Sequence, residues 1–380
     1  MSATGGGPGA ALGRLCGQLL SVGTDGLLAP DDLRRRIAAS DVGGVMLFRP
    51  NIADPAQVAT LVGALREASP GTAPLLVSID QEGGLVQRLR APLTVWPDML
   101  SVGSAGDAAA TLRVGRAVGD ELGALGIGWD FAPVLDVNTN PANPVIGNRA
   151  FGTTPEGVSA QALAFWRGLR AAGLVGCGKH FPGHGDTHTD SHHDLPVVEH
   201  ELDRLRRIEL APFAAAAAAG MEAFMTAHVL YPALDPQWPA TLSRRILTEL
   251  LRGELGFRGV VVSDDLGMKA VAARYPIEEL AVLSVLAGAD HLLVREPVDR
   301  QIAAHEALIH AAEARSEVRA RVQESAARMA ALKALVLVGL PAPGTALPAL
   351  LGRAEHRALA ASFKRVSPDG AVKSSPVADS

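Results

Sequence analysis

The chain has 380 residues and a formal net charge of −5, and 48% of its residues are hydrophobic. The acidic balance and the 4% aromatic content argue against a nucleic-acid-binding protein, which normally carries a basic stripe and base-stacking rings. No run reaches the roughly 18–20 uninterrupted apolar residues of a membrane span. Only Cys16 and Cys177 are present, and no basic and then apolar segment opens the chain, so we expect a cytoplasmic protein without disulfides, without a membrane anchor and without a nucleic-acid partner.

Short apolar runs rich in valine, isoleucine and leucine recur along the chain, separated by longer mixed segments. Their hydrophobicity is continuous rather than alternating, which is typical of strands buried on both faces of a parallel sheet. Eight strands are predicted in this way, at residues 19–23, 43–48, 74–80, 127–137, 174–179, 222–229, 258–265 and 289–294.

The segments between these runs have helical spacing. Asp54 before Pro55 marks one helix start, because proline suits the first helical turn. Repeated alternation of strand and helix favours an α/β fold, a single-domain (β/α)8 TIM barrel. An open doubly wound sheet is the alternative, although no GxGxxG motif follows an early strand. Helices are expected at residues 55–68, 108–125, 155–172 and 202–219.

The barrel domain is expected to cover residues 15–340. Residues 1–14 are mostly small and are predicted to form a flexible N-terminus. Residues 341–380 are a C-terminal extension with one short helical patch, and the composition of its last fifteen or so residues predicts a flexible, disordered tail.

Polar residues follow most of the predicted strands, and a (β/α)8 barrel builds its active site at the carboxyl ends of its strands. One such end reads SIDQEGGLVQRL, in which Gly83 and Gly84 permit a tight turn that returns Arg88 towards Asp80. This acid and arginine could hold a polyhydroxylated ligand, or they could form a structural ion pair. The other candidates at strand ends are Asp136, Lys179, His180, His228, Ser263, Asp264 and Asp265.

The segment RGVVVSDDLGM places Asp264 where a buried strand meets its loop. An ionised carboxylate at that point could act as the nucleophile of a double-displacement glycoside transfer. Serine and aspartate at a strand end also cap the helix that follows, so the motif alone leaves both interpretations open.

Six of the eleven histidines fall within residues 180–200, where glycines and prolines indicate a loop. The cluster could bind a metal, although no HExxH motif and no cysteine pair is present. Most of these imidazoles could instead be ordinary loop residues. A third hypothesis concerns Asp190 and His192, because a carboxylate that holds one ring nitrogen leaves the other free to exchange a proton with a substrate.

Four segments together, KHFPGHGDTHTDSHHDLP, SIDQEGGLVQRL, NPVIGNRAFG and GVVVSDDLGM, resemble family 3 of the glycoside hydrolases. Within that family the histidine-rich segment is similar to the single-domain bacterial β-N-acetylglucosaminidases of the NagZ type. The resemblance extends over residues 15–335. It implies a TIM barrel that works with neither a cofactor nor a metal.

The resemblance also implies roles for individual residues. Asp264 would be the nucleophile, and His192, oriented by Asp190, would be the general acid and base. Leu85 and Gly267 depart from the family pattern, where arginine and serine are common, but neither replaces a proposed catalytic group. The residues that would hold the terminal sugar are Asp80, Arg88, Arg149, Lys179 and His180.

The implied function is that of a monomeric, retaining exo-β-N-acetylglucosaminidase, which removes terminal N-acetylglucosamine from peptidoglycan-derived muropeptides. A phosphorylase of the same family is the close alternative, because a histidine acid/base tolerates phosphate as the acceptor. Substrate-assisted hydrolysis, a metal-dependent hydrolase and a catalytically silent sugar-binding protein are the remaining hypotheses.

Overall fold

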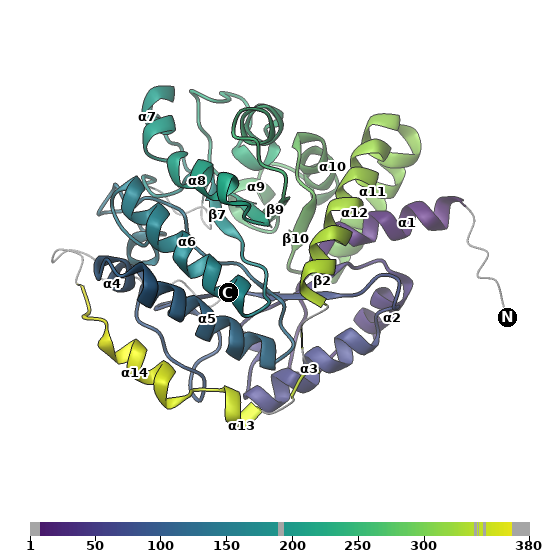
Figure 1. The fold of residues 1–380 in the computed structure, drawn as a ribbon. Coiled ribbons are helices and arrows are strands. Elements are labelled where there is room, and N and C mark those ends of the chain that lie inside the picture. The colour runs from purple at the N-terminus through teal and green to yellow at the C-terminus, as the bar shows by residue number, and fades with distance from the viewer. Residues whose placement is uncertain (1–7, 189–193, 338–339, 341, 345–346, 367–380) are drawn as a thin grey trace.

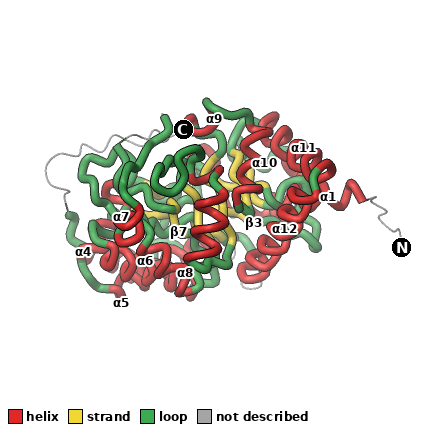
Figure 2. The backbone as a smooth tube through the Cα atoms, turned by 90° about the horizontal axis from the view of Figure 1, so that it is seen from above, coloured by secondary structure: helices red, strands yellow, loops and turns green. Residues whose placement is uncertain are grey.

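Eight parallel strands lie at the centre of the molecule, with helices around them (Figures 1 and 2). The computed structural model describes residues 8–188, 194–337, 340, 342–344 and 347–366. The strand order in the sheet is β6-β3-β2-β1-β10-β9-β8-β7. Each strand overlaps one of the eight predicted runs: β1 Leu20–Val22, β2 Gly44–Leu47, β3 Leu76–Ile79, β6 Trp129–Asp130, β7 Gly178–Phe181, β8 Ala223–Thr226, β9 Val260–Asp265 and β10 His291–Val294.

The two outer strands of this order, β6 and β7, are also joined to each other. Isolated parallel bridges pair Trp129 with Val175 and Val134 with Lys179. Regular strand pairing within the predicted run 127–137 is limited to β6, and these bridges continue the contact beyond it. The sheet therefore curls round on itself, and the predicted (β/α)8 TIM barrel is confirmed.

Helices form the outer layer of the barrel, and α5 packs along α6. Three of the predicted helices are confirmed as α3, α5 and α6. In the described part of the chain, no helix combines the length and the apolar character needed to cross a membrane. The longer helices are α1 Pro8–Gln18, α2 Asp31–Ala39, α3 Pro55–Glu67, α5 Ala108–Ala124, α6 Pro155–Ala171, α8 Ala211–Ala219, the π-helix η4 Arg245–Glu254, α10 Ile277–Ala287, α11 Val298–Ala314, α12 Ser316–Leu337 and α14 Ala354–Ser362. Shorter elements include α4 Met99–Ser104, η2 Gly147–Arg149, α7 Leu202–Arg207, α9 Lys269–Ala272, α13 Leu347–Leu350 and the hairpin of β4 Gln81–Gly83 with β5 Val86–Gln87.

Two local signals decide where helices begin and break. The carboxylate of Asp54 accepts a hydrogen bond from the backbone N–H of Gln57 at 2.9 Å, so it caps α3 at the predicted start. The prediction of one helix over residues 202–219 is wrong, because the segment divides into α7 and α8. Pro212 stands in the first turn of α8, where it has no N–H to continue a preceding helix.

The interior of the barrel is filled by large side chains, and α12 covers its amino-terminal end. Met329, Leu332 and Val336 of α12 belong to the same buried cluster as side chains that begin three strands. Those strand-starting residues are Leu76, Ala223 and Val260. Because α12 covers this end, the carboxyl ends of the strands form the opposite face of the barrel.

The first described residues do not form the predicted flexible terminus. Residues 8–14 belong to helix α1, which packs against α11 and α12, so the expectation for this part of residues 1–14 was wrong. The physical reason is a short apolar stripe. Leu12 and Cys16, one helical turn apart, are both buried against the core.

The C-terminal extension adds two helices, α13 and α14, which pack against α5. Glu121 of α5 is buried at this contact. It accepts a hydrogen bond from the N–H of Gly352 at 3.0 Å and lies 3.1 Å from Nδ1 of His356. The tail that is predicted to be disordered begins at about residue 366, and residues 367–380 lie outside the described residues.

Candidate active site

The carboxyl ends of the barrel strands gather charged side chains on one face. Asp80 directly follows β3, Lys179 and His180 lie in β7, and Asp264 lies near the end of β9. Enzymes built on (β/α)8 barrels place their catalytic groups at these positions. This face, which lies opposite α12, is the candidate active site.

Asp80 stands between two cations. Its Oδ1 lies 2.7 Å from Nζ of Lys179, and its Oδ2 accepts a hydrogen bond from Nη2 of Arg88 at 3.3 Å. Arg88 returns to Asp80 because the β4–β5 hairpin turns at Gly83 and Gly84, whose φ angles of 112° and 60° favour glycine. The turn predicted from SIDQEGGLVQRL is therefore confirmed, together with the contact between Arg88 and Asp80.

Glu82 is a member of this charged network that the sequence analysis missed. Its side chain is 1% exposed, and both oxygens accept hydrogen bonds from Arg149, at 2.8 and 2.9 Å. Nζ of Lys179 lies 2.5 Å from the same carboxylate. The sequence signal that could have identified Glu82 was its position two residues after Asp80, in the same turn at the end of the strand.

The network keeps its charges near neutral pH. Burial opposes the charge of Glu82, but Arg149 and Lys179 outweigh it and hold the pKa of this carboxyl well below its usual range. Burial likewise opposes the charge of Lys179, but Asp80 and Glu82 outweigh it and raise the pKa of the ammonium. Glu82 and Lys179 therefore both carry their charges near neutral pH.

His180 is oriented by a buried carboxylate. Its Nδ1 lies 2.7 Å from Oδ2 of Asp136, and its Nε2 lies 3.5 Å from Nη2 of Arg149. The backbone N–H of His184, a histidine that the sequence analysis did not single out, also donates to Asp136 at 2.6 Å. Burial, followed by the neighbouring His180, lowers the pKa of His184 to about 4, so this imidazole is neutral at pH 7.

The two aspartates at the end of β9 have different surroundings. Oδ1 of Asp265 accepts hydrogen bonds from the backbone N–H groups of Gly267 at 2.9 Å and Arg295 at 3.1 Å. Burial raises the pKa of Asp265. Its own N–H donates to Oδ1 of Asp264 at 2.8 Å. Asp265 thus ties β9 to the chain beyond β10, and Asp264 is the better candidate for a reactive carboxylate.

The predicted acid/base pair, Asp190 and His192, lies outside the described residues, so its role stays a prediction. The loop that leads to it is closely packed where it leaves β7. A Cβ atom at Gly185 would come within 1.8 Å of the carbonyl oxygen of Val137, so only glycine fits there.

The chain segments that precede and follow Asp190 and His192 contact each other. Nε2 of His200 pairs with Asp186, and Nη2 of Arg204 donates to the same carboxylate at 2.9 Å. Among the described residues, Asp186, His200 and Glu209 could hold a metal ion, because their ligand atoms lie within 4.8 Å of one another. However, the guanidinium of Arg204 already contacts both carboxylates, which lowers their affinity for a cation.

All five residues predicted to hold a sugar meet at one end of the barrel: Asp80, Arg88, Arg149, Lys179 and His180. Their proximity is established by these contacts, and their role as sugar ligands stays a prediction.

Comparison with known proteins agrees with this geometry. Residues 13–332 match the model of the glycosyl hydrolase family 3 N-terminal domain. β-Hexosaminidase A of Pseudoalteromonas piscicida is 38% identical over 365 residues, which cover 88% of this chain and 60% of the relative. The chain thus spans 60% of the length of that longer protein. A β-hexosaminidase of Thiobacillus denitrificans is 43% identical over 270 residues, covering 70% of this chain and 74% of the relative.

Solved structures are similar as well. A family 3 β-N-acetylglucosaminidase from Paenibacillus sp. FPU-7 matches with a TM-score of 0.85 and 45% identity, covering 92% of this chain and 67% of that one. NagZ from Neisseria gonorrhoeae, in complex with N-trifluoroacetyl-D-glucosamine, matches with a TM-score of 0.74 and 32% identity, covering 91% and 96%. The chain, as its motifs predicted, belongs to glycosyl hydrolase family 3 and is a glycosidase.

Proposed function

We propose that the protein is a retaining exo-β-N-acetylglucosaminidase that removes terminal N-acetylglucosamine from peptidoglycan-derived muropeptides. The observation that carries the proposal is the ion network of Asp80, Lys179 and Arg88 at the end of the barrel where β9 presents Asp264. The proposal also draws on the relatives, one of which is a β-N-acetylglucosaminidase and another of which was solved with an N-acylated glucosamine.

The proposed sugar subsite consists of Asp80, Arg88, Arg149, Lys179 and His180. Carboxylate oxygens accept hydrogen bonds from sugar hydroxyls, while ammonium and guanidinium groups donate to them. Nε of Arg88 is buried and has no hydrogen-bond partner among the described residues. It is therefore a donor available to a ligand that enters the barrel mouth, and a sugar hydroxyl would satisfy it.

The proposed chemistry is a double displacement. The carboxylate of Asp264 attacks the anomeric carbon while His192, as imidazolium, gives its proton to the leaving oxygen. His192 is then neutral and takes a proton from water, whose oxygen attacks the anomeric carbon and releases Asp264. Asp190 would orient the imidazole and stabilise its charged form. The sugar leaves with its original anomeric configuration.

The natural substrate in this proposal is a small, soluble muropeptide fragment, cleaved by a cytoplasmic monomer. Sedimentation of the purified protein tests its oligomeric state, and cell fractionation tests its compartment.

Replacing Asp264 by alanine tests the nucleophile. The variant should lose at least about a thousandfold in kcat/KM on an aryl β-N-acetylglucosaminide, because no other group would form the covalent intermediate. Asp31→Ala is the matched control, since the Asp31 side chain is 88% exposed on α2 and should leave the rate unchanged. Normal turnover by a folded Asp264→Ala protein would rule out the assignment.

Trapping experiments separate this mechanism from its rivals. A fluorinated glycosyl donor with a good leaving group should label the peptide that contains Asp264, whereas substrate-assisted hydrolysis would leave the peptide unlabelled.

If the enzyme is a hydrolase, its product remains the free sugar when phosphate is added; formation of a sugar phosphate would identify a phosphorylase. Activity that survives prolonged chelation would exclude a metal-dependent hydrolase.

A further inference from the structure

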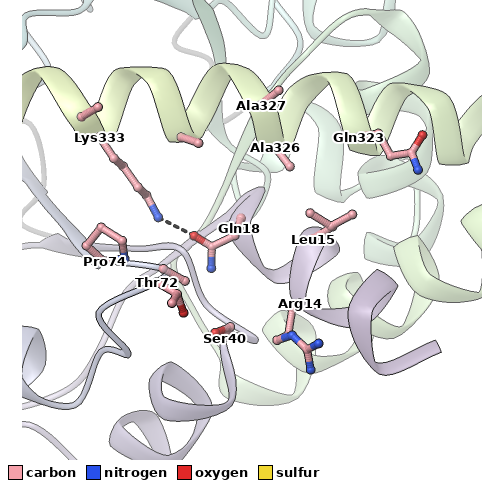
Figure 3. A pocket seen from close by; sticks show the side chains of 13 residues that line it. Arg14, Leu15, Gln18, Ser40, Thr72, Pro74, Gln323, Ala326, Ala327 and Lys333 are labelled. Carbon is pink, nitrogen blue, oxygen red and sulfur yellow. Dashed lines mark hydrogen bonds between the residues drawn. The ribbon is translucent and has the colours of Figure 1, made fainter. Parts of the chain in front are cut away.

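A pocket lies at the end of the barrel opposite the candidate active site, between α1 and α12 (Figure 3). Its volume is about 700 Å³, which is in the range of small-molecule sites. The segments that lead into β2 and β3 complete its wall through Ser40 and Thr72. The pocket therefore belongs to the amino-terminal face, whereas Asp80, Lys179 and Asp264 lie at the carboxyl ends of the strands.

The charged residues that line this pocket are both basic. Lys333 of α12 is 3% exposed, and Arg14 comes from α1 (Figure 3). Nζ of Lys333 donates to the carboxamide oxygen of Gln18 at 2.6 Å, and among the described residues no aspartate or glutamate lines the pocket. Burial without a compensating anion lowers the pKa of Lys333 to about 7. A buried ammonium in this setting would be stabilised by an incoming negative charge.

A second donor lies beside the lysine. Nε2 of Gln18 is buried and has no hydrogen-bond partner among the described residues. Lys333 and Gln18 thus offer two adjacent donors, which match the two oxygens of a carboxylate. A phosphate dianion would need more donors and more positive charge than these two groups supply.

The rest of the pocket is apolar. Ala326 and Ala327 present short side chains along α12, and Leu15 and Pro74 line the pocket from α1 and the segment before β3 (Figure 3). Ala330 of α12 also lines the pocket. Small side chains on the helix leave room for a ligand rather than filling it. An aliphatic chain laid along this wall would lose contact with water.

We propose that this pocket binds a small amphiphilic carboxylate, with its carboxylate at Lys333 and Gln18 and its aliphatic chain along the alanines of α12. The site is separate from the glycosidase site and does not depend on the proposed substrate. It would give the enzyme a second ligand class, which enters from the other end of the barrel.

Isothermal titration calorimetry of octanoate binding to the full-length protein tests the proposal. The wild-type protein should bind one octanoate saturably in the millimolar range or tighter. Lys333→Met should weaken this binding at least about tenfold, and octanamide, which lacks the charge, should bind the wild type at least about tenfold more weakly than octanoate. Lys364→Met, which removes an exposed lysine from the C-terminal extension, is the control and should bind octanoate like the wild type.

A steric variant keeps the test decisive if Lys333→Met does not fold. Ala330→Phe fills the pocket from an exposed position on α12 and should abolish octanoate binding, while turnover of an aryl glycoside stays unchanged. The proposal is overturned if the wild type shows no saturable octanoate binding. It is equally overturned if folded Lys333→Met or Ala330→Phe binds octanoate as tightly as the wild type.

Discussion

Glu82 carries its charge inside the protein because two cations contact it. Its carboxylate pairs with Arg149 through two hydrogen bonds and with Lys179 through a third contact. Removing one partner from a buried ion pair leaves an uncompensated charge, which is more costly than removing both. The side chain therefore orders both Arg149 and Lys179 and holds them in place at the barrel mouth.

Replacing Glu82 by glutamine retains the shape of the side chain but removes its charge. At neutral pH the variant should lose about 3–5 kcal/mol of unfolding free energy, because Arg149 and Lys179 lose their shared anion. The pKa of Glu82 in the folded protein is below its ordinary value of 4.5, so its contribution is fully present above pH 4.5 and is lost as the pH falls below it. The difference in unfolding free energy between the wild type and the variant should therefore shrink as the pH falls below 4.5.

Urea unfolding at a series of pH values measures this difference. Glu254→Gln is the matched control, because Glu254 pairs with Arg206 at a site where its side chain is 55% exposed. That variant should change stability by less than about 1 kcal/mol. A Glu82→Gln penalty that stays constant at every pH would show that the charge of Glu82 is not the cause.

At the scale of elements, a second ion cluster fastens α12 to the barrel. Asp290, which stands directly before β10, has a fully buried side chain that contacts Arg252 of η4 as well as Arg321 and Arg328 of α12. Its Oδ2 also accepts a hydrogen bond from the N–H of Val261 in β9 at 3.0 Å. One carboxylate thus connects two strands, the π-helix and the helix that covers the amino-terminal end.

Asp290→Asn should destabilise the protein by about 3–5 kcal/mol, because three guanidinium groups lose their common anion. Glu324→Gln is the comparison within the same cluster. Glu324 contacts Arg321 and Arg328, but its side chain is 49% exposed, so its loss should cost less than about 1 kcal/mol. Equal Tm losses in the two variants would contradict the importance of burial here.

These elements also show what could be predicted from the sequence. Continuous apolar runs located the eight strands, because a parallel strand is buried on both faces. The contact between Asp80 and Arg88 was predictable because a short glycine turn joins them. Glu82 and Arg149 are 67 residues apart, and their contact depends on how the barrel closes, which no local pattern encodes. Pro212 indicated the break before α8, but the helical spacing on both sides of it favoured one continuous helix.

At the scale of the whole molecule, the barrel has two distinct ends, and the C-terminal extension packs against its side. The candidate active site occupies the carboxyl ends of the strands, and α12 with the Lys333 pocket occupies the other end. The C-terminal extension packs against α5. It follows residue 332, where the match to the family model ends. We expect this extension to stabilise the barrel rather than to take part in the chemistry.

Truncation after Leu340 tests that expectation. The shortened protein should unfold several degrees lower, because the buried Glu121 loses both Gly352 and His356 and the core loses the side chain of Phe363. Its kcat/KM on an aryl β-N-acetylglucosaminide, measured below the new Tm, should stay within about twofold of the wild type. A truncation that removes only residues 367–380 is the control, since it leaves α13 and α14 in place. An unchanged Tm after the longer truncation would exclude a stabilising role, and a folded but inactive product would place the extension in the catalytic machinery.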